Sequence, residues 1–207
     1  MLEKFYGHCM WLKKIQGIAK SAQTQYQQSQ LFVIAIDGCG GAGKSTLCQA
    51  LSDEIKPWAH TQVVKLDDFY HPLTKIQQGK LHNVYARDAY FNVSEFKDCL
   101  LEPLLKGMKV SYKPVHWVNG ESDDSIELLP KGVLIIDGVF AFSKPLRDMV
   151  HLSLFVDTPR SLRKQRMLAR PQDDTSWIDH WQCTESWHHH QESTVDAVEH
   201  LVLGDQT

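Results

Sequence analysis

The chain has 207 residues, 43% of them hydrophobic, and a formal net charge of −3. This length and apolar content suffice for one α/β domain with a complete core. The charge gives no broad electrostatic footprint for nucleic acid, although a local basic patch stays open. No segment approaches the ~20 consecutive apolar residues of a membrane span, and charged residues near the N-terminus interrupt any secretory leader. Five cysteines without a disulfide spacing are typical of reduced thiols. We therefore expect a cytoplasmic protein with neither a nucleic-acid nor a membrane partner.

We interpret residues 1–30 as a helical extension and residues 31–207 as the main domain. Residues 2–28 predict an amphipathic helix, because apolar side chains recur at helical spacing. The predicted stripe consists of Leu2, Phe5, Cys9, Leu12, Ile15 and Ala19. Packing of this stripe on the chain's own domain is the favoured interpretation, with a partner protein or a membrane surface as the alternative.

Residues 38–45 match the phosphate-binding pattern G-x-x-x-x-G-K-[ST]. The run is Gly38, Cys39, Gly40, Gly41, Ala42, Gly43, Lys44 and Ser45. Glycines let the backbone turn tightly with positive φ, so that several N–H groups point at one anion. The following helix adds the partial positive charge of its N-terminus. We expect Lys44 to reach the β- and γ-phosphates and Ser45 to ligate Mg²⁺, with Cys39 as a small buried spacer and Thr46 as a further nucleotide-binding residue.

The surroundings of this loop have the order that such a site requires. Residues 31–36 form a continuous apolar run, typical of a strand buried on both faces of a parallel sheet. Residues 45–55 then predict a helix with Leu47, Ala50, Leu51 and Ile55 on its buried side. A strand, a glycine loop and a helix follow one another, as in P-loop proteins.

Two carboxylates follow the next predicted strand, residues 61–66. They are Asp67 and Asp68, with Phe69, Tyr70 and His71 behind them. In an open parallel sheet, ligands gather at the carboxyl ends of the strands. A carboxylate there, beside a phosphate loop, can accept a proton from an attacking hydroxyl or hold Mg²⁺ through water. We favour this function over helix capping.

The middle of the chain predicts a substrate region. Residues 72–93 are polar and irregular, which is typical of a substrate loop or lid. Residues 94–105 predict a helix that Ser94 caps and Gly107 ends. Residues 110–117 predict an extended segment whose aromatic and polar side chains either stack on a base or sugar or pack into the core. These side chains are Tyr112, His116 and Trp117, and a turn is expected over residues 119–124.

Two more buried strands follow. Residues 133–138 are an apolar run followed by Asp137 and Gly138, in the form of a Walker B element whose Asp137 orients Mg²⁺ or its water shell. Residues 152–157 precede a basic helix that Pro159 opens. Arg163, Arg166 and Arg170 are spaced by i, i+3 and i+7 and are expected to share a helix face. Such a face can clamp transferring phosphates, so we favour a phosphate lid over a solvated basic face.

The last segment carries tryptophans and three consecutive histidines. Adjacent histidines cannot all face one metal on a helix, and no cysteine pair at zinc spacing accompanies them. We therefore expect His188, His189 and His190 to be exposed at the surface. Residues 198–203 predict a final strand, which Gly204 ends.

These motifs resemble those of the uridine kinase and phosphoribulokinase branch of P-loop kinases, over residues 31–203. Asp67-Asp68-Phe69-Tyr70 is similar to the family's D-x-F-Y segment, residues 133–142 to its Walker B segment, and residues 156–160 to the segment before the lid. The resemblance implies that Asp67 is the catalytic base, that Tyr70 lines the nucleoside pocket and that the three arginines belong to the lid. Trp177, Trp181 and Glu185 are similar to residues found after the lid in bacterial members.

Departures from the family pattern fall on the acceptor side. Val115 and His116 stand where uridine-phosphorylating members have tyrosine and aspartate. The ribose-contacting segment is matched loosely by residues 87–91, which implies a contact from Asp88. The lid lacks the usual R-G-R and has Pro171-Gln172-Asp173-Asp174 in its place.

The sequence thus predicts an α/β, three-layer P-loop NTPase fold with a mainly parallel central sheet. The expected reaction is ATP- and Mg²⁺-dependent phosphorylation of a hydroxyl on a small metabolite, a nucleoside such as uridine or cytidine first. Two alternatives stay open: a kinase for pantothenate or a phosphosugar, served by Lys80, Arg87 or Lys113, and a nucleotide-gated regulatory ATPase. Homo-oligomerisation also stays open.

Overall fold

The computed structural model describes residues 2–27, 30–71, 86–116, 120–170 and 175–204. Its centre is a five-stranded sheet in the order β2-β7-β1-β8-β9, and all four neighbouring pairs run parallel. The strands are β1 (Leu31–Gly38), β2 (Thr61–Lys65), β7 (Gly132–Asp137), β8 (Leu152–Asp157) and β9 (His200–Leu203). This confirms the predicted α/β class and parallel sheet.

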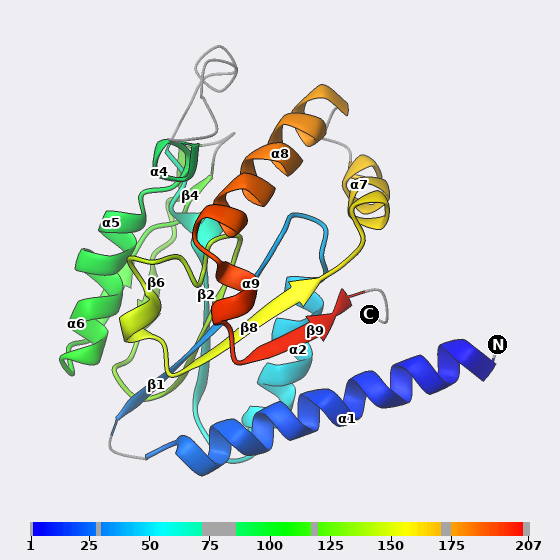
Figure 1. Cartoon of the computed structure of the whole chain (residues 1–207). Helices are drawn as coiled ribbons and strands as arrows, with labels where there is room; N and C mark the ends of the chain where they lie inside the picture. Colours follow the sequence, from blue (N-terminus) through cyan, green and yellow to red (C-terminus); the bar gives the residue numbers. More distant parts are fainter. Residues whose placement is uncertain (1, 28–29, 72–85, 117–119, 171–174, 205–207) are drawn as a thin grey trace.

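Helices cover both faces of the sheet and so make three layers (Figure 1). On one face lie α1 (Leu2–Gln25) and α2 (Lys44–Ile55), and on the other lie α8 (Thr175–Gln191), α9 (Thr194–Ala197) and the segment from residue 86 to 105. All eight residues of β1 are buried. Alternate side chains of this strand enter the two core clusters, Phe32 the one under α1 and α2 and Val33 the other. This two-sided burial explains the continuous apolar run in the sequence.

The predicted helix over residues 94–105 is present but is not a regular α-helix. It is built from α5 (Val93–Glu95), a π-helical stretch, η3 (Phe96–Leu101), and α6 (Glu102–Leu105). Its N-cap is Asn92, whose side chain accepts a hydrogen bond from the Glu95 N–H, and not the expected Ser94. Gly107 ends the helix as predicted, with a φ of 81° and its N–H bonded to the carbonyl of Leu104.

Smaller elements connect the main helices and strands. They are η1 (Leu66–Asp68), α4 (Ala86–Tyr90), η4 (Arg147–Met149), α7 (Arg160–Leu168) and two antiparallel pairs, β3 (Val110–Tyr112) with β6 (Ile126–Leu128) and β4 (Val115–His116) with β5 (Gly120–Glu121). Residues 120–121 therefore form a short strand where the sequence predicted only a turn.

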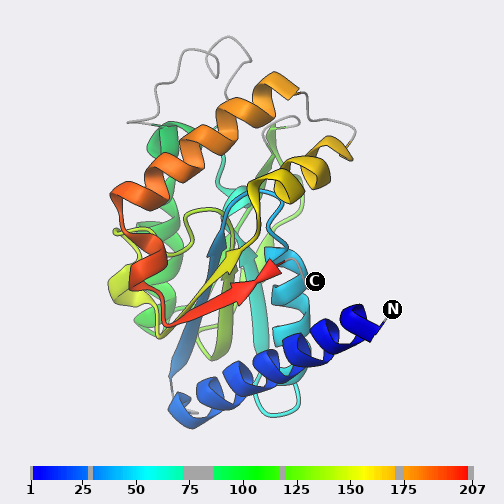
Figure 2. The same ribbon diagram turned by 45° about the vertical axis from the view of Figure 1, so that its right-hand side comes forward.

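Helix α1 lies along α2 and β9, as Figure 2 shows from a second side. Ile15 and Ala19 are buried as expected, but Leu12 is exposed. The stripe is rotated, because Trp11, Ile18 and Ala22 complete the buried face. The side chains of Leu2, Phe5 and Cys9 lie outside the described residues. Within the described ranges, no helix combines the length and the apolar character needed to cross a bilayer.

Candidate active site

The phosphate loop joins β1 to α2 and requires its glycines. Gly38, Gly41 and Gly43 have φ values of 143°, 75° and 103°, in the region that side chains rarely adopt. A Cβ on Gly41 would lie 2.7 Å from the carbonyl oxygen of Arg163, and one on Gly38 would lie 2.7 Å from that of Val156. Backbone conformation and close packing therefore both exclude a side chain at these two positions.

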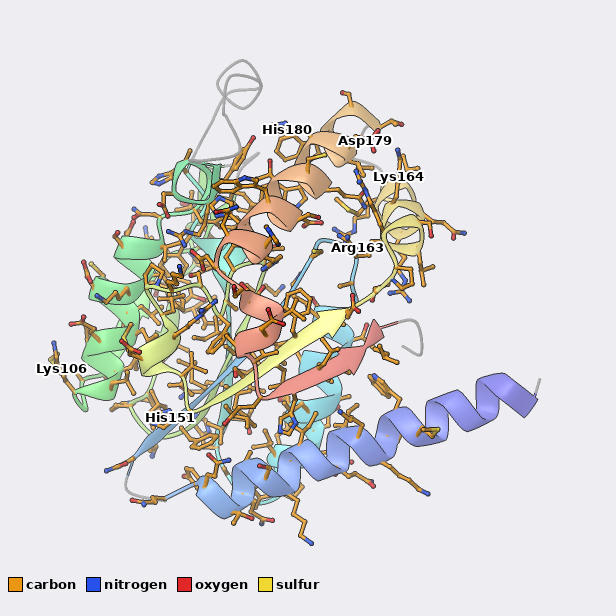
Figure 3. All side chains as sticks on the ribbon, in the orientation of Figure 1. Lys106, His151, Arg163, Lys164, Asp179 and His180 are labelled. Carbon is orange, nitrogen blue, oxygen red and sulfur yellow. The ribbon has the colours of Figure 1, made fainter. Side chains whose placement is uncertain are left out.

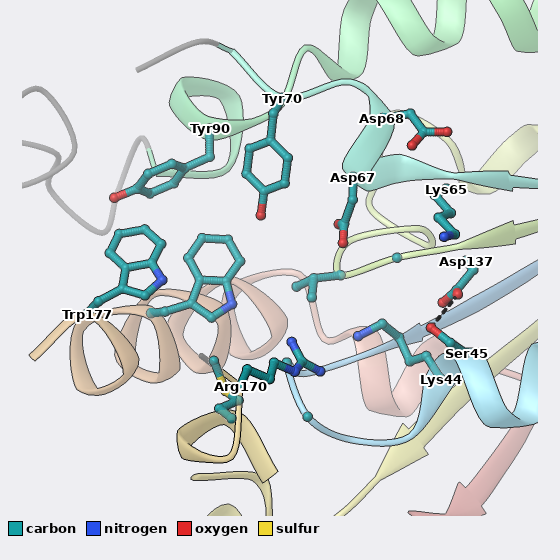
Figure 4. Close-up of a pocket in the computed structure, with 16 residues that line it drawn as sticks. Lys44, Ser45, Lys65, Asp67, Asp68, Tyr70, Tyr90, Asp137, Arg170 and Trp177 are labelled. Atoms are coloured by element: carbon teal, nitrogen blue, oxygen red, sulfur yellow. Dashed lines mark hydrogen bonds between the residues drawn. The ribbon is translucent and has the colours of Figure 1, made fainter. Parts of the chain in front are cut away.

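Lys44 and Ser45, the first residues of α2, carry the polar side chains at the end of the loop. The Lys44 ammonium donates to the carbonyls of Gly38 (2.9 Å) and Cys39 (3.1 Å). The Ser45 hydroxyl donates to Oδ2 of Asp137 at 2.8 Å (Figure 4). Asp137 comes close because β7 runs parallel to β1, with Ile36 opposite Asp137. A hydroxyl beside a carboxylate is an oxygen donor set that suits Mg²⁺, so these two residues fit the predicted metal site.

A cavity of about 410 Å³ opens at the carboxyl ends of β1, β2 and β7. Figure 4 shows Lys44, Lys65, Ser45 and Asp137 toward one end, Asp67 in the middle, and the rings of Tyr90 and Trp177 at the other end. The lining residues are Gly40, Gly41, Lys44, Ser45, Lys65, Asp67, Asp68, Tyr70, Tyr90, Asp137, Gly138, Val139, Met167, Arg170, Trp177 and Trp181. A second cavity of about 310 Å³ lies over the loop and is lined by residues 41–46 with Arg166 and Arg170.

The neighbours Asp67 and Asp68 lie in different surroundings. Asp67 points into the cavity (Figure 4). Desolvation raises its pKa, with further increases from Asp137 and Asp68 that Lys44 opposes. Asp68 is buried and accepts a hydrogen bond of 2.9 Å from the Tyr112 hydroxyl. Asp67 is therefore the carboxylate that is better placed to meet a ligand.

The three predicted lid arginines do not share one role. Arg163 is buried and pairs with Glu185 at 2.5 Å. Arg166 donates to the carbonyls of Gly41 and Ala42 at 3.3 Å, so it lies at the loop. The helix α7 ends at Leu168, so Arg170 lies beyond it, and only Arg170 of the three lines the 410 Å³ cavity.

Glu185 of α8 braces the loop from outside. Its side chain is fully buried, and its Oε2 accepts the Gly40 N–H at 2.7 Å while its Oε1 accepts from Arg163. Burial raises the pKa of Glu185, which Gly40 and Arg163 counteract. One carboxylate thus links the phosphate loop, α7 and α8. In the sequence, Glu185 stood out only through its resemblance to family members. Its bond to Gly40, 145 residues away, leaves no local sequence pattern.

Asp37, which the sequence analysis missed, braces the loop that follows β7. It is fully buried, and its carboxylate accepts the N–H groups of Gly38 at 2.6 Å and of Phe140 and Phe142 at 2.9 Å. Phe140 has a φ of 73°. The sequence signal for this residue was a single aspartate at the end of an apolar strand. A carboxylate buried there requires several hydrogen-bond donors, which predicts a structural contact.

The predicted acceptor residues are spread over two cavities and the surface. Tyr70 lines the 410 Å³ cavity and also a neighbouring one of about 520 Å³, where Tyr112 and Lys113 lie. Asp88 is exposed and pairs with Arg87 at 2.7 Å, away from both cavities. The side chain of His116 and the whole of Trp117 and Lys80 lie outside the described residues.

The expectation that all three histidines are exposed was wrong for two of them. His188 and His189 are buried, and only His190 is exposed. The His188 ring accepts the Arg87 N–H at 3.0 Å, and burial lowers its pKa to about 4. Their spacing from Trp181 and Glu185 places them on the buried face of α8. No group of three metal-binding side chains occurs in the described part of the chain. Cys39 is buried as expected, which raises its pKa.

Comparisons with known proteins show the family of this chain. A family model described as the Phosphoribulokinase / Uridine kinase family matches residues 33–199. Uridine kinase-like protein 5 of Arabidopsis thaliana is 32% identical over 68% of this chain, but the match spans only 30% of that relative. The uridine kinase of Staphylococcus aureus (strain JH9) is 31% identical over 67% of each chain.

Solved structures show the same fold. A structure described as a possible uridine kinase from Bacillus stearothermophilus has a TM-score of 0.71 at 18% identity, covering 92% of this chain and 97% of that one. A D-glycerate 3-kinase from Cryptococcus neoformans has a TM-score of 0.62 at 12% identity, covering 95% and 96%. The family match and the phosphate loop together show that this chain belongs to the Phosphoribulokinase / Uridine kinase family of P-loop kinases.

Proposed function

We propose that this chain is an ATP-dependent kinase that phosphorylates a hydroxyl of a small metabolite, a nucleoside such as uridine or cytidine first. The observation that carries the proposal is that Lys44, the Ser45–Asp137 pair and Asp67 all line one cavity. A hydrolase needs only a positioned water, whereas a carboxylate facing open space beside a phosphate loop suits an acceptor hydroxyl.

Each residue has a role that follows from its position. The loop amides and Lys44 bind the β- and γ-phosphates, with Thr46, Arg166 and Arg170 toward the nucleotide. Ser45 and Asp137 are the residues that would hold Mg²⁺, which offsets phosphate charge when bound. Asp67 accepts the proton of the acceptor hydroxyl, and Tyr70 helps to orient that acceptor.

Arg163 is proposed as a positioning residue, in place of the direct phosphate contact expected from the sequence. Its guanidinium also donates to the carbonyl of Thr158 at 3.1 Å, so that it connects β8, α7 and α8 behind the loop. Asp88 and Tyr112 retain no direct contact in this proposal: the first is at the surface and the second supports Asp68.

An acceptor panel with a coupled ADP assay tests the proposal. Uridine, cytidine, pantothenate and a phosphosugar should be compared, with Lys44→Ala as the inactive control. We expect ADP formation that depends on the acceptor and is abolished in Lys44→Ala. ATP turnover that no small alcohol stimulates would support the regulatory ATPase and contradict the kinase.

A further inference from the structure

One end of the 410 Å³ cavity is a wall of three aromatic rings. We call Tyr90 of α4 with Trp177 and Trp181 of α8 the aromatic wall. The two indoles stack with centroids 5.8 Å apart and planes inclined by 20°. The Tyr90 ring meets both edge-on, at 5.7 Å and 5.3 Å. Figure 4 shows Trp177 and Tyr90 at the end of the cavity opposite Lys44 and Ser45.

The wall is held in place by the surrounding protein. Trp181 and Tyr90 are almost fully buried, whereas Trp177 is partly exposed. The Tyr90 hydroxyl is 3.2 Å from Nε2 of His180, so its polar group already has a partner. Burial raises the pKa of Tyr90 to about 12, which keeps the phenol neutral. A ligand that binds the wall meets preformed rings and loses little side-chain freedom in ordering them.

The wall differs in charge from the rest of the cavity. Among the described residues that line the cavity, the cations are Lys44, Lys65 and Arg170; the two lysines lie at the end opposite the wall, and the guanidinium of Arg170 is directed toward Lys44 (Figure 4). A phosphate or carboxylate at the far end of an acceptor would exchange its hydration for aromatic faces, which is costly. A neutral flat ring would instead stack on an indole.

Trp181 lies against the phosphate loop, where a Cβ on Gly40 would be 3.2 Å from its indole nitrogen, whereas the position of Trp177 and Tyr90 at the far end assigns the wall to the acceptor. The two cavities share Gly41, Lys44, Ser45 and Arg170, so both meet at the phosphate-binding groups. The 410 Å³ cavity alone contains Asp67 and the aromatic wall, while the other contains Thr46 and Arg166. A ring against the wall lies on the side of the proposed base.

We propose that the aromatic wall binds the ring of the acceptor, and that Trp177 is the residue that selects for it. This inference rests on the proposed function and narrows it: the acceptor is an uncharged alcohol that carries a planar heterocycle. It disfavours the phosphosugar and pantothenate alternatives, because each would place an anionic group on uncharged rings. Trp177 selects the ring because it is the most exposed member of the wall.

Three variants test this assignment. Trp177→Leu removes the stacking face, Trp177→Phe restores a ring, and Trp187→Leu is the matched control, since Trp187 is on α8 but does not line the cavity. Uridine and D-ribose form a matched pair of acceptors with and without a ring. Because stacking on an aromatic side chain changes binding strongly, Trp177→Leu should raise the KM for uridine about tenfold or more.

The expected pattern is a larger KM for uridine with an unchanged KM for ATP and for ribose, with recovery in Trp177→Phe and no change in Trp187→Leu. Equal effects on uridine and ribose, a rise in the KM for ATP alone, or a preference for pantothenate or ribose 5-phosphate would overturn the inference. If no acceptor is phosphorylated, the proposed function fails, and binding of labelled uridine to wild type and Trp177→Leu still decides the role of the wall.

Discussion

The raised pKa of Asp67 sets the pH dependence of the proposed reaction. A base must be ionised, and desolvation raises the pKa of this carboxyl above the ordinary aspartate value of about 3.9. Because this shift belongs to the enzyme without bound ligands, we expect kcat/KM to rise with pH through an acidic limb that lies above that value. A pH–rate profile measures the limb, and one centred at or below the ordinary value would contradict the assignment.

Asp67→Asn separates the chemical role of this residue from its structural role. The amide keeps the shape but cannot take the proton, so kcat should fall by ~10²-fold or more while ATP binding stays largely intact. The pKa of Asp67 is higher in the folded than in the unfolded chain, so the free energy of unfolding falls as pH rises from the ordinary aspartate pKa through the folded-state pKa. At neutral pH the ionised carboxylate therefore does not stabilise the fold. The variant should therefore melt no lower than wild type at neutral pH. Near-normal turnover would remove Asp67 from the mechanism.

How much of the site could be predicted from sequence depends on whether each residue's partners are local. The phosphate loop, Asp67 and Asp137 could be recognised because a motif or a strand end positions them. The pairing of Arg163 with Glu185, 22 residues away, could not, since helical spacing gives the face but not its neighbour. Asp37 was missed, and His189 was wrongly expected at the surface, for the same reason: their contacts come from distant elements.

At the scale of elements, α8 connects the phosphate loop to the aromatic wall. Glu185→Gln tests this connection, because it leaves Arg163 buried with a neutral partner and weakens the bond to the Gly40 N–H. Loss of one member of a buried pair typically costs ~3–5 kcal/mol. We expect a marked fall in Tm in thermal unfolding, together with a higher KM for ATP.

A surface pair provides the control for this substitution. Asp53 near the end of α2 and Lys56, which follows the helix, are both more than half exposed and lie 2.8 Å apart. Exposed ion pairs contribute little, so Asp53→Asn should leave both Tm and the KM for ATP nearly unchanged. Equal effects of the two substitutions would show that Glu185 is not a brace.

The regular elements were more predictable than their ends. Buried parallel strands such as β1 and β7 have a continuous apolar run, so their positions were predicted within a residue or two. The stretch over Phe96–Leu101 was expected to be α-helical and is π-helical. Apolar spacing does not distinguish these closely related helices, and tertiary packing decides between them.

At the scale of the whole molecule, the extension α1 is part of the core. The side chain of Ile15, on the inner face of α1, is almost fully buried, whereas that of Leu12 on the same helix is 40% exposed. Ile15→Ala should therefore destabilise the protein by ~2–5 kcal/mol, and Leu12→Ala by less than about 0.5 kcal/mol. Denaturant unfolding measures both, and the KM values should not change. Similar losses in the two variants would contradict the observed face of α1.

The three-layer architecture followed from the order of strands and helices, while the rotation of α1 did not. A helix with apolar side chains at several spacings can present more than one stripe. The choice is made by the surface that it meets, here α2 and β9. The sequence therefore predicted that α1 packs but not which side chains it buries.

Two side-chain supports of the phosphate loop, and the bond that ties the end of β1 to the loop after β7, come from later parts of the chain. Ser45 bonds to a residue 92 positions downstream, Asp37 to one 103 downstream and Gly40 to one 145 downstream. During translation, the glycine turn leaves the ribosome on the order of ten seconds before α8 is made. A nascent chain thus carries the nucleotide motif well before it can hold the motif in shape, and competence for phosphate binding arrives only once α8 has been made.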